Sequence, residues 1–288
     1  MTDFLGALDI NNRDISLAIW ISLIFIWAIS QKAVRKSFAN VLKALAARVI
    51  LISWTVMLAY IALIVYLLYL SQIWEIGNLK DTVYWLFGSG FVFYLNINQI
   101  RREGYIRKAV VDSLKVLVLI EFIVNLYVFN IWVELILLVP ILLLLGGLLG
   151  CASVYEKYKQ VEGFLTTLLA IVGFGILVFV AVSIVYDIQG FFSLDNLRDF
   201  LIPILLTIGF VPFLYVCGLY SLYDSIFRRI GVFAENKRIA LYAKLRTFLA
   251  FGLNLSSVRS WSREMGLLKL SEKTDIVEAI RKFRTEGA

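Results

Sequence analysis

Seven apolar runs, separated by short polar segments, dominate the first 222 residues of this chain. They are expected at residues 15–30, 49–73, 82–97, 111–129, 133–151, 164–186 and 200–222. A helix of about 20 apolar residues crosses the ~30 Å of hydrocarbon in a bilayer, and several of these runs reach that length. The pattern therefore predicts an all-α polytopic bundle of about seven transmembrane helices. The two sixteen-residue runs, 15–30 and 82–97, are the least able to cross fully, because each covers only about 24 Å.

The segment between the first two runs has a different pattern. Its apolar residues recur at helical spacing: Val34, Phe38, Val41, Leu42 and Leu45. Basic residues surround them: Lys32, Arg35, Lys36 and Lys43. A helix with one apolar and one basic face is typical of the membrane interface, so we expect an amphipathic helix lying on the membrane surface here.

The last 66 residues are polar enough to form a domain outside the membrane. Three amphipathic helices are expected there, at Glu235–Phe251, Ser257–Met265 and Asp275–Arg284. Gly252 and Gly266 follow the first two, as is common just past a helix end. Because 13 side chains are basic and 7 are acidic, the segment carries a charge of +6. We therefore expect a transmembrane domain at 1–222 and a small basic helical tail at 223–288.

Composition and charge support this division and predict its orientation. The chain is 61% hydrophobic and only 17% charged, whereas a soluble domain is about a quarter charged. If the N-terminus lies outside, 25 of the 28 Lys and Arg residues fall in inner segments, and only Arg13, Lys80 and Arg198 fall outside. The sequence thus predicts a multi-pass cell-membrane protein, in bacteria an inner-membrane protein, with the N-terminus out and the C-terminus in.

Two polar residues interrupt the fourth apolar run. Glu121 and Asn125 are four apart, so they share one face of a helix. A carboxyl group at membrane depth is costly unless it faces protein, water or a partner. Glu121 is then either a neutral acid buried against polar neighbours or part of a ring of carboxylates, one per subunit, around a cation path.

A second set of polar residues, spaced seven apart, lies on the third run: Thr82, Ser89 and Asn96. This spacing predicts one polar stripe along a helix, which lines water or bonds to neighbouring helices. Small residues and prolines mark other runs. Gly146 and Gly150 form a GxxxG pattern that packs helices within a subunit or between subunits. In the last run Pro203, Gly209 and Pro212 indicate a static kink or a gating hinge.

Enzymatic chemistry is disfavoured by what the sequence lacks. There is no histidine, which removes the usual base of serine and cysteine triads and the HExxH type of zinc site. No phosphate-binding loop, GxGxxG fingerprint or CxxC pair occurs. We therefore expect a protein that is not an enzyme and that holds neither a cofactor nor a metal ion.

The tail offers candidate contacts to an anionic ligand or to lipid. They are Lys237, Arg238, Lys244, Arg246, Arg281, Lys282 and Arg284. Basic side chains of this kind hold an anionic lipid surface or bind an anionic signal such as a nucleotide or oligonucleotide. The tail is also a candidate for contacts with a cytoplasmic partner protein or for assembly of a homo-oligomer.

In its plan of seven short spans, one intramembrane acid and a compact basic tail, the chain resembles the membrane effectors of bacterial antiviral (anti-phage) defence systems. The resemblance implies an oligomeric pore or a membrane-disrupting partner that is controlled by a cytoplasmic signal. Two hypotheses follow from the sequence. The first is an oligomeric ion channel or membrane-permeabilising effector regulated through its tail. The alternative is a non-conducting membrane scaffold or anchor, or a transporter subunit, that works with a partner protein.

Overall fold

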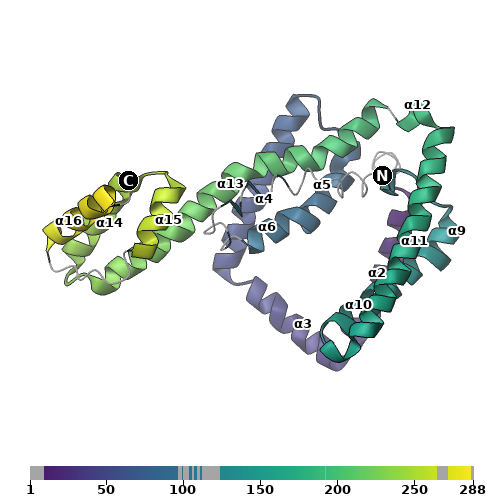
Figure 1. The fold of residues 1–288 in the computed structure, drawn as a ribbon, viewed down its shortest axis with the longest axis horizontal. Coiled ribbons are helices and arrows are strands. Elements are labelled where there is room, and N and C mark those ends of the chain that lie inside the picture. Colours follow the sequence, from purple (N-terminus) through teal and green to yellow (C-terminus); the bar gives the residue numbers. More distant parts are fainter. Residues whose placement is uncertain are drawn as a thin grey trace. The chain divides into compact units, whose positions relative to one another are not determined.

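All regular secondary structure in the described part of the chain is helical. The computed structural model describes residues 10–96, 99, 104–105, 107–108, 111, 124–191, 193–264 and 272–286. These residues form helices and no β-strand, so the expected all-α class is confirmed (Figure 1). Five stretches among them are long and apolar enough to cross a membrane: Asn12–Ser30, Ile50–Leu70, Ile131–Ser153, Glu156–Tyr186 and Ile188–Phe233.

These five stretches overlap five of the seven expected spans. The run 82–97 is helical but divided, into α5 (Leu79–Trp85), a π-helical turn η2 (Leu86–Gly90) and α6 (Phe91–Leu95). Most of the run 111–129, including Glu121, lies outside the described residues. A multi-pass membrane protein agrees with the five apolar stretches, whereas the number seven and the orientation stay predictions.

The chain divides into two compact units. The described parts of Met1–Tyr84 and Ser113–Leu206 make the first, and those of Trp85–Asp112 and Thr207–Ala288 make the second. Helices α2 (Asn12–Ser30), α3 (Lys32–Leu45) and α4 (Arg48–Leu70) open the first unit. It continues with α9 (Ile131–Val133), the π turn η4 (Glu134–Leu138), α10 (Val139–Ser153), α11 (Lys159–Tyr186), α12 (Ile188–Phe191) and the beginning of α13 (Leu194–Phe233).

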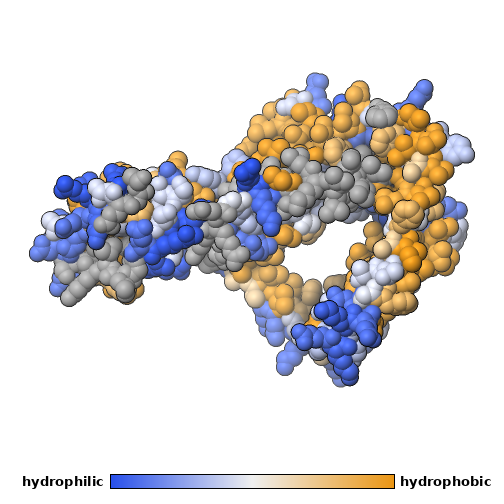
Figure 2. Space-filling view, viewed as in Figure 1, coloured by the Kyte–Doolittle hydropathy of each residue, from blue (hydrophilic) through white to orange (hydrophobic). Residues whose placement is uncertain are grey.

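One buried cluster of the first unit lies where the segment η4–α10 and helix α11 run side by side (Figure 1). Leu138, Ile176 and Val180 are buried together there. Beside them the rings of Phe129 and Phe179 stack with their centroids 3.9 Å apart. Most other apolar side chains of these two helices are exposed or half-buried, so the helices present a large apolar surface (Figure 2).

Helix α3 has the amphipathic pattern expected from the sequence. It packs next to α2, where the rings of Phe25 and Phe38 meet edge to face at 5.7 Å between centroids. None of its residues is buried, so the apolar residues Val34, Val41 and Leu42 remain exposed. The helix is thus confirmed, and its position at a membrane interface stays a prediction.

Besides η2 and α6, the described part of the second unit contains the rest of α13 and three helices that follow it. These are α14 (Lys237–Phe251), α15 (Leu255–Glu264) and α16 (Lys273–Glu286), each within a few residues of the range expected from the sequence. Asn236 caps the start of α14 by accepting from two backbone N–H groups. Gly252 ends that helix at φ +51°, a value that favours glycine because it has no Cβ.

Aromatic and aliphatic side chains from α13, α14, α15 and α16 pack together in the second unit. Trp261 of α15 is 2% exposed and lies 5.5 Å, between ring centroids, from Phe283 of α16. Tyr223 of α13 donates from its hydroxyl to the carbonyl oxygen of Gly252 at 2.7 Å. Arg229 of α13 likewise donates to the carbonyl oxygen of Ser262 at 2.6 Å. These contacts fasten α14 and α15 to α13.

Candidate functional site

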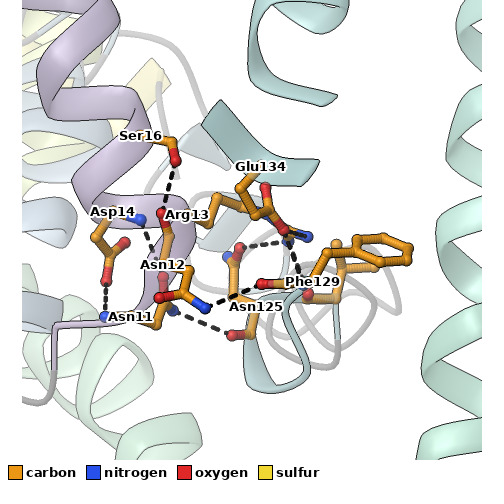
Figure 3. A network of polar contacts seen from close by, with 9 residues as sticks. Asn11, Asn12, Arg13, Asp14, Ser16, Asn125, Phe129 and Glu134 are labelled. Carbon is orange, nitrogen blue, oxygen red and sulfur yellow. Dashed lines mark hydrogen bonds and ion pairs between the residues drawn. The ribbon is translucent and has the colours of Figure 1, made fainter. Parts of the chain in front are cut away.

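A buried ion pair between Arg13 and Glu134 is the centre of a polar network in the described part of the first unit (Figure 3). The terminal NH2 of Arg13 lies 2.9 Å from Oε1 of Glu134, and Nε donates to Oε2 at 3.2 Å. The arginine is 8% exposed and the glutamate is 0% exposed. Two parallel hydrogen bonds of this kind are the strongest geometry for an arginine and a carboxylate.

Further hydrogen bonds satisfy donors of Arg13 and acceptors of Glu134 that the ion pair does not use. The other terminal nitrogen of Arg13 donates to the carbonyl oxygen of Val124 at 2.8 Å and to Oδ1 of Asn125 at 3.4 Å. Oε1 of Glu134 also accepts from the backbone N–H of Phe129 at 3.1 Å. Burying two charges is costly unless their remaining donors and acceptors are bonded, so these contacts are what make the buried pair tolerable.

The start of α2 positions this network. Asn11 and Asp14 form a capping box, in which each side chain accepts from the other residue's backbone N–H. The Asn12 side chain donates to the carbonyl oxygen of Phe129 at 3.1 Å, and that of Asn11 to the carbonyl oxygen of Asn125 at 3.3 Å. Three consecutive residues of α2 and its cap thus hold the segment 124–134 (Figure 3).

Pro140 explains a second contact between α2 and the helix that follows Glu134. Proline has no N–H, and just before it the backbone makes the π turn η4, in which the Val139 N–H bonds Glu134 instead of Leu135. The carbonyl oxygen of Leu135 accepts instead from Nε1 of Trp20 at 2.7 Å. Because Trp20 is seven residues after Arg13, both side chains leave α2 on one face.

All three basic residues that the charge pattern places outside are paired with carboxylates. Arg13 pairs with Glu134, and Lys80 lies 3.5 Å from Asp14. In a second group Arg198 lies 2.6 Å from Glu75 and 3.4 Å from Asp195. Within the described residues, each of these cations therefore has a neighbouring anion at the same end of the first unit.

Three of the polar residues predicted inside the membrane, Thr82, Asn96 and Asn125, have local hydrogen-bond partners. Asn125 belongs to the Arg13 network, whereas Glu121 lies outside the described residues. The Thr82 hydroxyl is buried, donates to the carbonyl oxygen of Asn78 and accepts from Nε1 of Trp74. Ser89 lies in the π turn η2 and is half-buried. Asn96 donates to the Val92 carbonyl oxygen and accepts from Gln99.

The predicted packing and hinge residues fall inside long helices. Gly146 and Gly150 lie on α10, and a Cβ built on either one would have no described atom within 4 Å beyond its own helix turn. The GxxxG surface is therefore exposed in the described chain. Pro203, Gly209 and Pro212 all lie within α13, which is helical from Leu194 to Phe233.

The basic candidates of the tail separate into three groups. Arg246, Arg281 and Arg284 line one groove of about 340 Å³ between α14 and α16. Lys237 and Lys244 line a second pocket of about 520 Å³ beside the turn between α13 and α14. Arg238 and Lys282 line neither. The structure thus brings Arg246 of α14 together with Arg281 and Arg284 of α16, which lie at least 35 residues later in the sequence.

The contacts of Arg13 with Glu134 and of Trp20 with Leu135 were not predicted from the sequence. There Arg13 is only one of three outer basic residues, and nothing marks Glu134 as its partner. A signal was present: Arg13, Ser16 and Trp20 put polar groups on one face of an otherwise apolar helix. Ser16 is 0% exposed, as expected for a small residue at a close helix contact.

Neither a metal site nor a similarity to known proteins identifies the function of this chain further. Within the described ranges, no group of three or more Cys, Asp or Glu side chains is close enough to hold a metal ion. Comparison of the chain with protein-family models, with curated proteins and with solved structures found no match in any of the three.

Proposed function

We propose that this chain is an oligomeric membrane protein that conducts ions or permeabilises the membrane, and that its C-terminal helices regulate it. The coarser part of this statement, a multi-pass integral membrane protein, agrees with five apolar helical stretches. In the sequence-based interpretation the carboxylate of Glu121, one per subunit, provides a cation-selective constriction. The proposal extends, through the resemblance to anti-phage effectors, to antiviral defence at a bacterial inner membrane.

The exposed glycine surface of α10 is the observation that best supports oligomerisation. Glycines four apart let two helix backbones approach closely, and in a membrane this is a common way for helices to associate. In the described chain no atom fills the space beside Gly146 and Gly150. Their close-packing partner is therefore best supplied by a second copy of the chain.

The low burial of the spans supports the same interpretation. Only 11% of the residues in the apolar window of Ile131–Ser153 are buried within the chain, and the same fraction applies to Glu156–Tyr186. Such helices need lipid or other subunits around them. The Arg13–Glu134 pair and the Trp20–Leu135 bond tie α2 to the start of α10, so the glycine surface is presented by a braced helix.

The first experiment measures the mass of the purified protein in detergent by light scattering. We expect an oligomer for the wild type and a smaller species for Gly146→Ile/Gly150→Ile, because the added side chains keep the backbones apart. Leu144→Phe/Leu148→Phe is the matched control, since it adds bulk at the same depth on the opposite face of α10. A wild-type monomer, or equal dissociation of both double variants, would refute the proposed interface.

The second experiment measures ion current in planar bilayers that contain the purified protein. We expect wild-type current with cation selectivity, and loss of that selectivity in Glu121→Gln with the oligomer intact. An oligomer that gives no current under any tested condition would favour the non-conducting scaffold. Unchanged selectivity in Glu121→Gln would remove this residue from the path.

Plaque counts on bacteria that express the wild type or the Gly146→Ile/Gly150→Ile variant test the proposed antiviral role. That role predicts protection only by the wild type.

A further inference from the structure

Three arginines from two helices meet at the groove between α14 and α16. Arg246 comes from α14, and Arg281 and Arg284 come from α16, which begins 22 residues after α14 ends. The Phe251–Phe283 ring contact joins the two helices, and Ile276 of α16 is fully buried. The groove of about 340 Å³ is within the size range of small-molecule sites, roughly 300–1,000 Å³.

No described carboxylate neutralises the positive charge of this groove. Among the described side chains, no carboxylate oxygen lies within 4.0 Å of the nitrogens of Arg246, Arg281 or Arg284. In the first unit, by contrast, Arg13 and Arg198 both have carboxylate partners. Three guanidinium groups gathered without an anion favour a ligand that brings negative charge.

Neutral acceptors hold two of the arginines in place. Arg284 donates from a terminal nitrogen to the carbonyl oxygen of Ala250 at 2.5 Å, near the C-terminal end of α14. Nε of Arg246 donates to the hydroxyl oxygen of Tyr242 at 3.2 Å. A guanidinium has five N–H donors, so each arginine keeps further donors for a ligand. Their forked geometry matches the oxygens of a phosphate group better than a lysine does.

Apart from Thr285, the other residues that line the groove are apolar, and an apolar surface continues along α14. Leu249, Val277 and Ile280 line it beside the arginines. Leu249 is 65% exposed, and Leu245 and Leu241, four and eight residues before it, are 56% and 71% exposed. Residues at this spacing form one stripe on a helix, so an apolar surface begins in the groove and extends away from it.

We propose that this groove binds a phosphate group that is attached to an apolar moiety. The phosphate contacts Arg246, Arg281 and Arg284, and the apolar moiety lies along Leu249 and Leu245. A phospholipid and a nucleotide share this chemistry. The site deepens the regulatory part of the proposed function and rests on it for its biological meaning. Binding itself is measured without any current, so failure of the site and failure of conduction are distinguishable.

The test uses the full-length protein in dodecyl maltoside, a detergent without phosphate, and isothermal titration calorimetry. One titration adds dioctanoyl phosphatidic acid, with dioctanoylglycerol and protein-free micelles as baselines, and the other adds ATP. In Arg246→Gln/Arg281→Gln/Arg284→Gln we expect affinity to fall about tenfold or more, because several charge-assisted hydrogen bonds are lost. The control Lys237→Gln/Arg238→Gln/Lys244→Gln removes the same charge outside the groove, and we expect a change of no more than about threefold from screened electrostatics.

Binding of the short-chain lipid identifies a membrane source for the phosphate, and binding of ATP identifies a soluble one. Either result supports the site when the two triple variants differ as expected. Absence of binding of both probes to the wild type overturns it, as does equal weakening in both triple variants. If the glutamine variant does not fold, Arg246→Lys/Arg281→Lys/Arg284→Lys keeps the charge and removes the forks. Binding several-fold weaker than that of the wild type is then expected, and unchanged affinity overturns the site.

Discussion

Nε1 of Trp20 donates to the carbonyl oxygen of Leu135 at 2.7 Å, where the π turn before Pro140 has moved the Val139 N–H to Glu134. Trp20 of α2 thus donates a hydrogen bond that the backbone around Pro140 cannot supply, because proline has no N–H. An unsatisfied carbonyl in a membrane or a protein interior costs free energy comparable to a lost hydrogen bond.

Trp20→Phe is therefore expected to destabilise the protein by about 1–3 kcal/mol, through the lost bond and the unpaired carbonyl. In a Pro140→Ala background, where an ordinary α turn can form, the same substitution is expected to cost less. The measurement is a double-mutant cycle of unfolding in detergent with increasing SDS, followed by circular dichroism. Equal costs in both backgrounds would contradict the role assigned to Pro140.

The Arg13–Glu134 pair makes a second prediction. Glu134→Gln leaves a buried arginine without its counter-ion, so we expect a loss of about 3–5 kcal/mol in unfolding free energy. Arg13→Met/Glu134→Leu removes both charges together and is expected to regain most of that loss. The exposed pair of Arg198 and Glu75 provides the control, because Glu75→Gln is expected to cost less than about 1 kcal/mol. Similar losses for Glu75→Gln and Glu134→Gln would show that burial does not strengthen the inner pair.

The orientation predicted from charge can be tested by labelling with a membrane-impermeant maleimide. In a background with Cys151 and Cys217 replaced by alanine, Leu194→Cys is expected to react from outside intact cells. Val154→Cys is expected to react only after the membrane is opened. Both native side chains are more than 70% exposed, so access to the thiol reports on the side of the membrane. The reverse pattern would invert the proposed topology.

Core packing in the second unit depends on α16. Ile276 is 0% exposed and its neighbour Val277 is 37% exposed on the same helix. Ile276→Ala is expected to destabilise the unit by about 2–5 kcal/mol because it leaves a cavity, whereas Val277→Ala is expected to cost much less. Hydrogen exchange of α14 and α15 amides, read by mass spectrometry, should rise only in the first variant. Equal exchange in the two variants would mean that α16 does not support the unit.

Local patterns in the sequence were sufficient to predict most of the described helices. Gly252 was expected to end a helix that begins near residue 235, and the structure ends α14 there with a positive φ. The apolar runs near residues 49–73 and 164–186 likewise became α4 and α11. Helix ends and the hydropathy of a run depend on residues that are neighbours along the chain, so both can be predicted from the sequence alone. The run with Glu121 remains a prediction, because it lies outside the described residues.

Only the tertiary structure decided which polar groups meet. Arg13 and Glu134 are 121 residues apart, and neither residue's surroundings in the sequence indicate the other as its partner. The same is true of Arg246, Arg281 and Arg284. In the sequence they are three of seven equivalent basic candidates, and only the packing of α14 against α16 brings them together. The physical reason is that an ion pair or a binding groove depends on the packing of distant segments, whereas hydropathy and helix ends are properties of single segments.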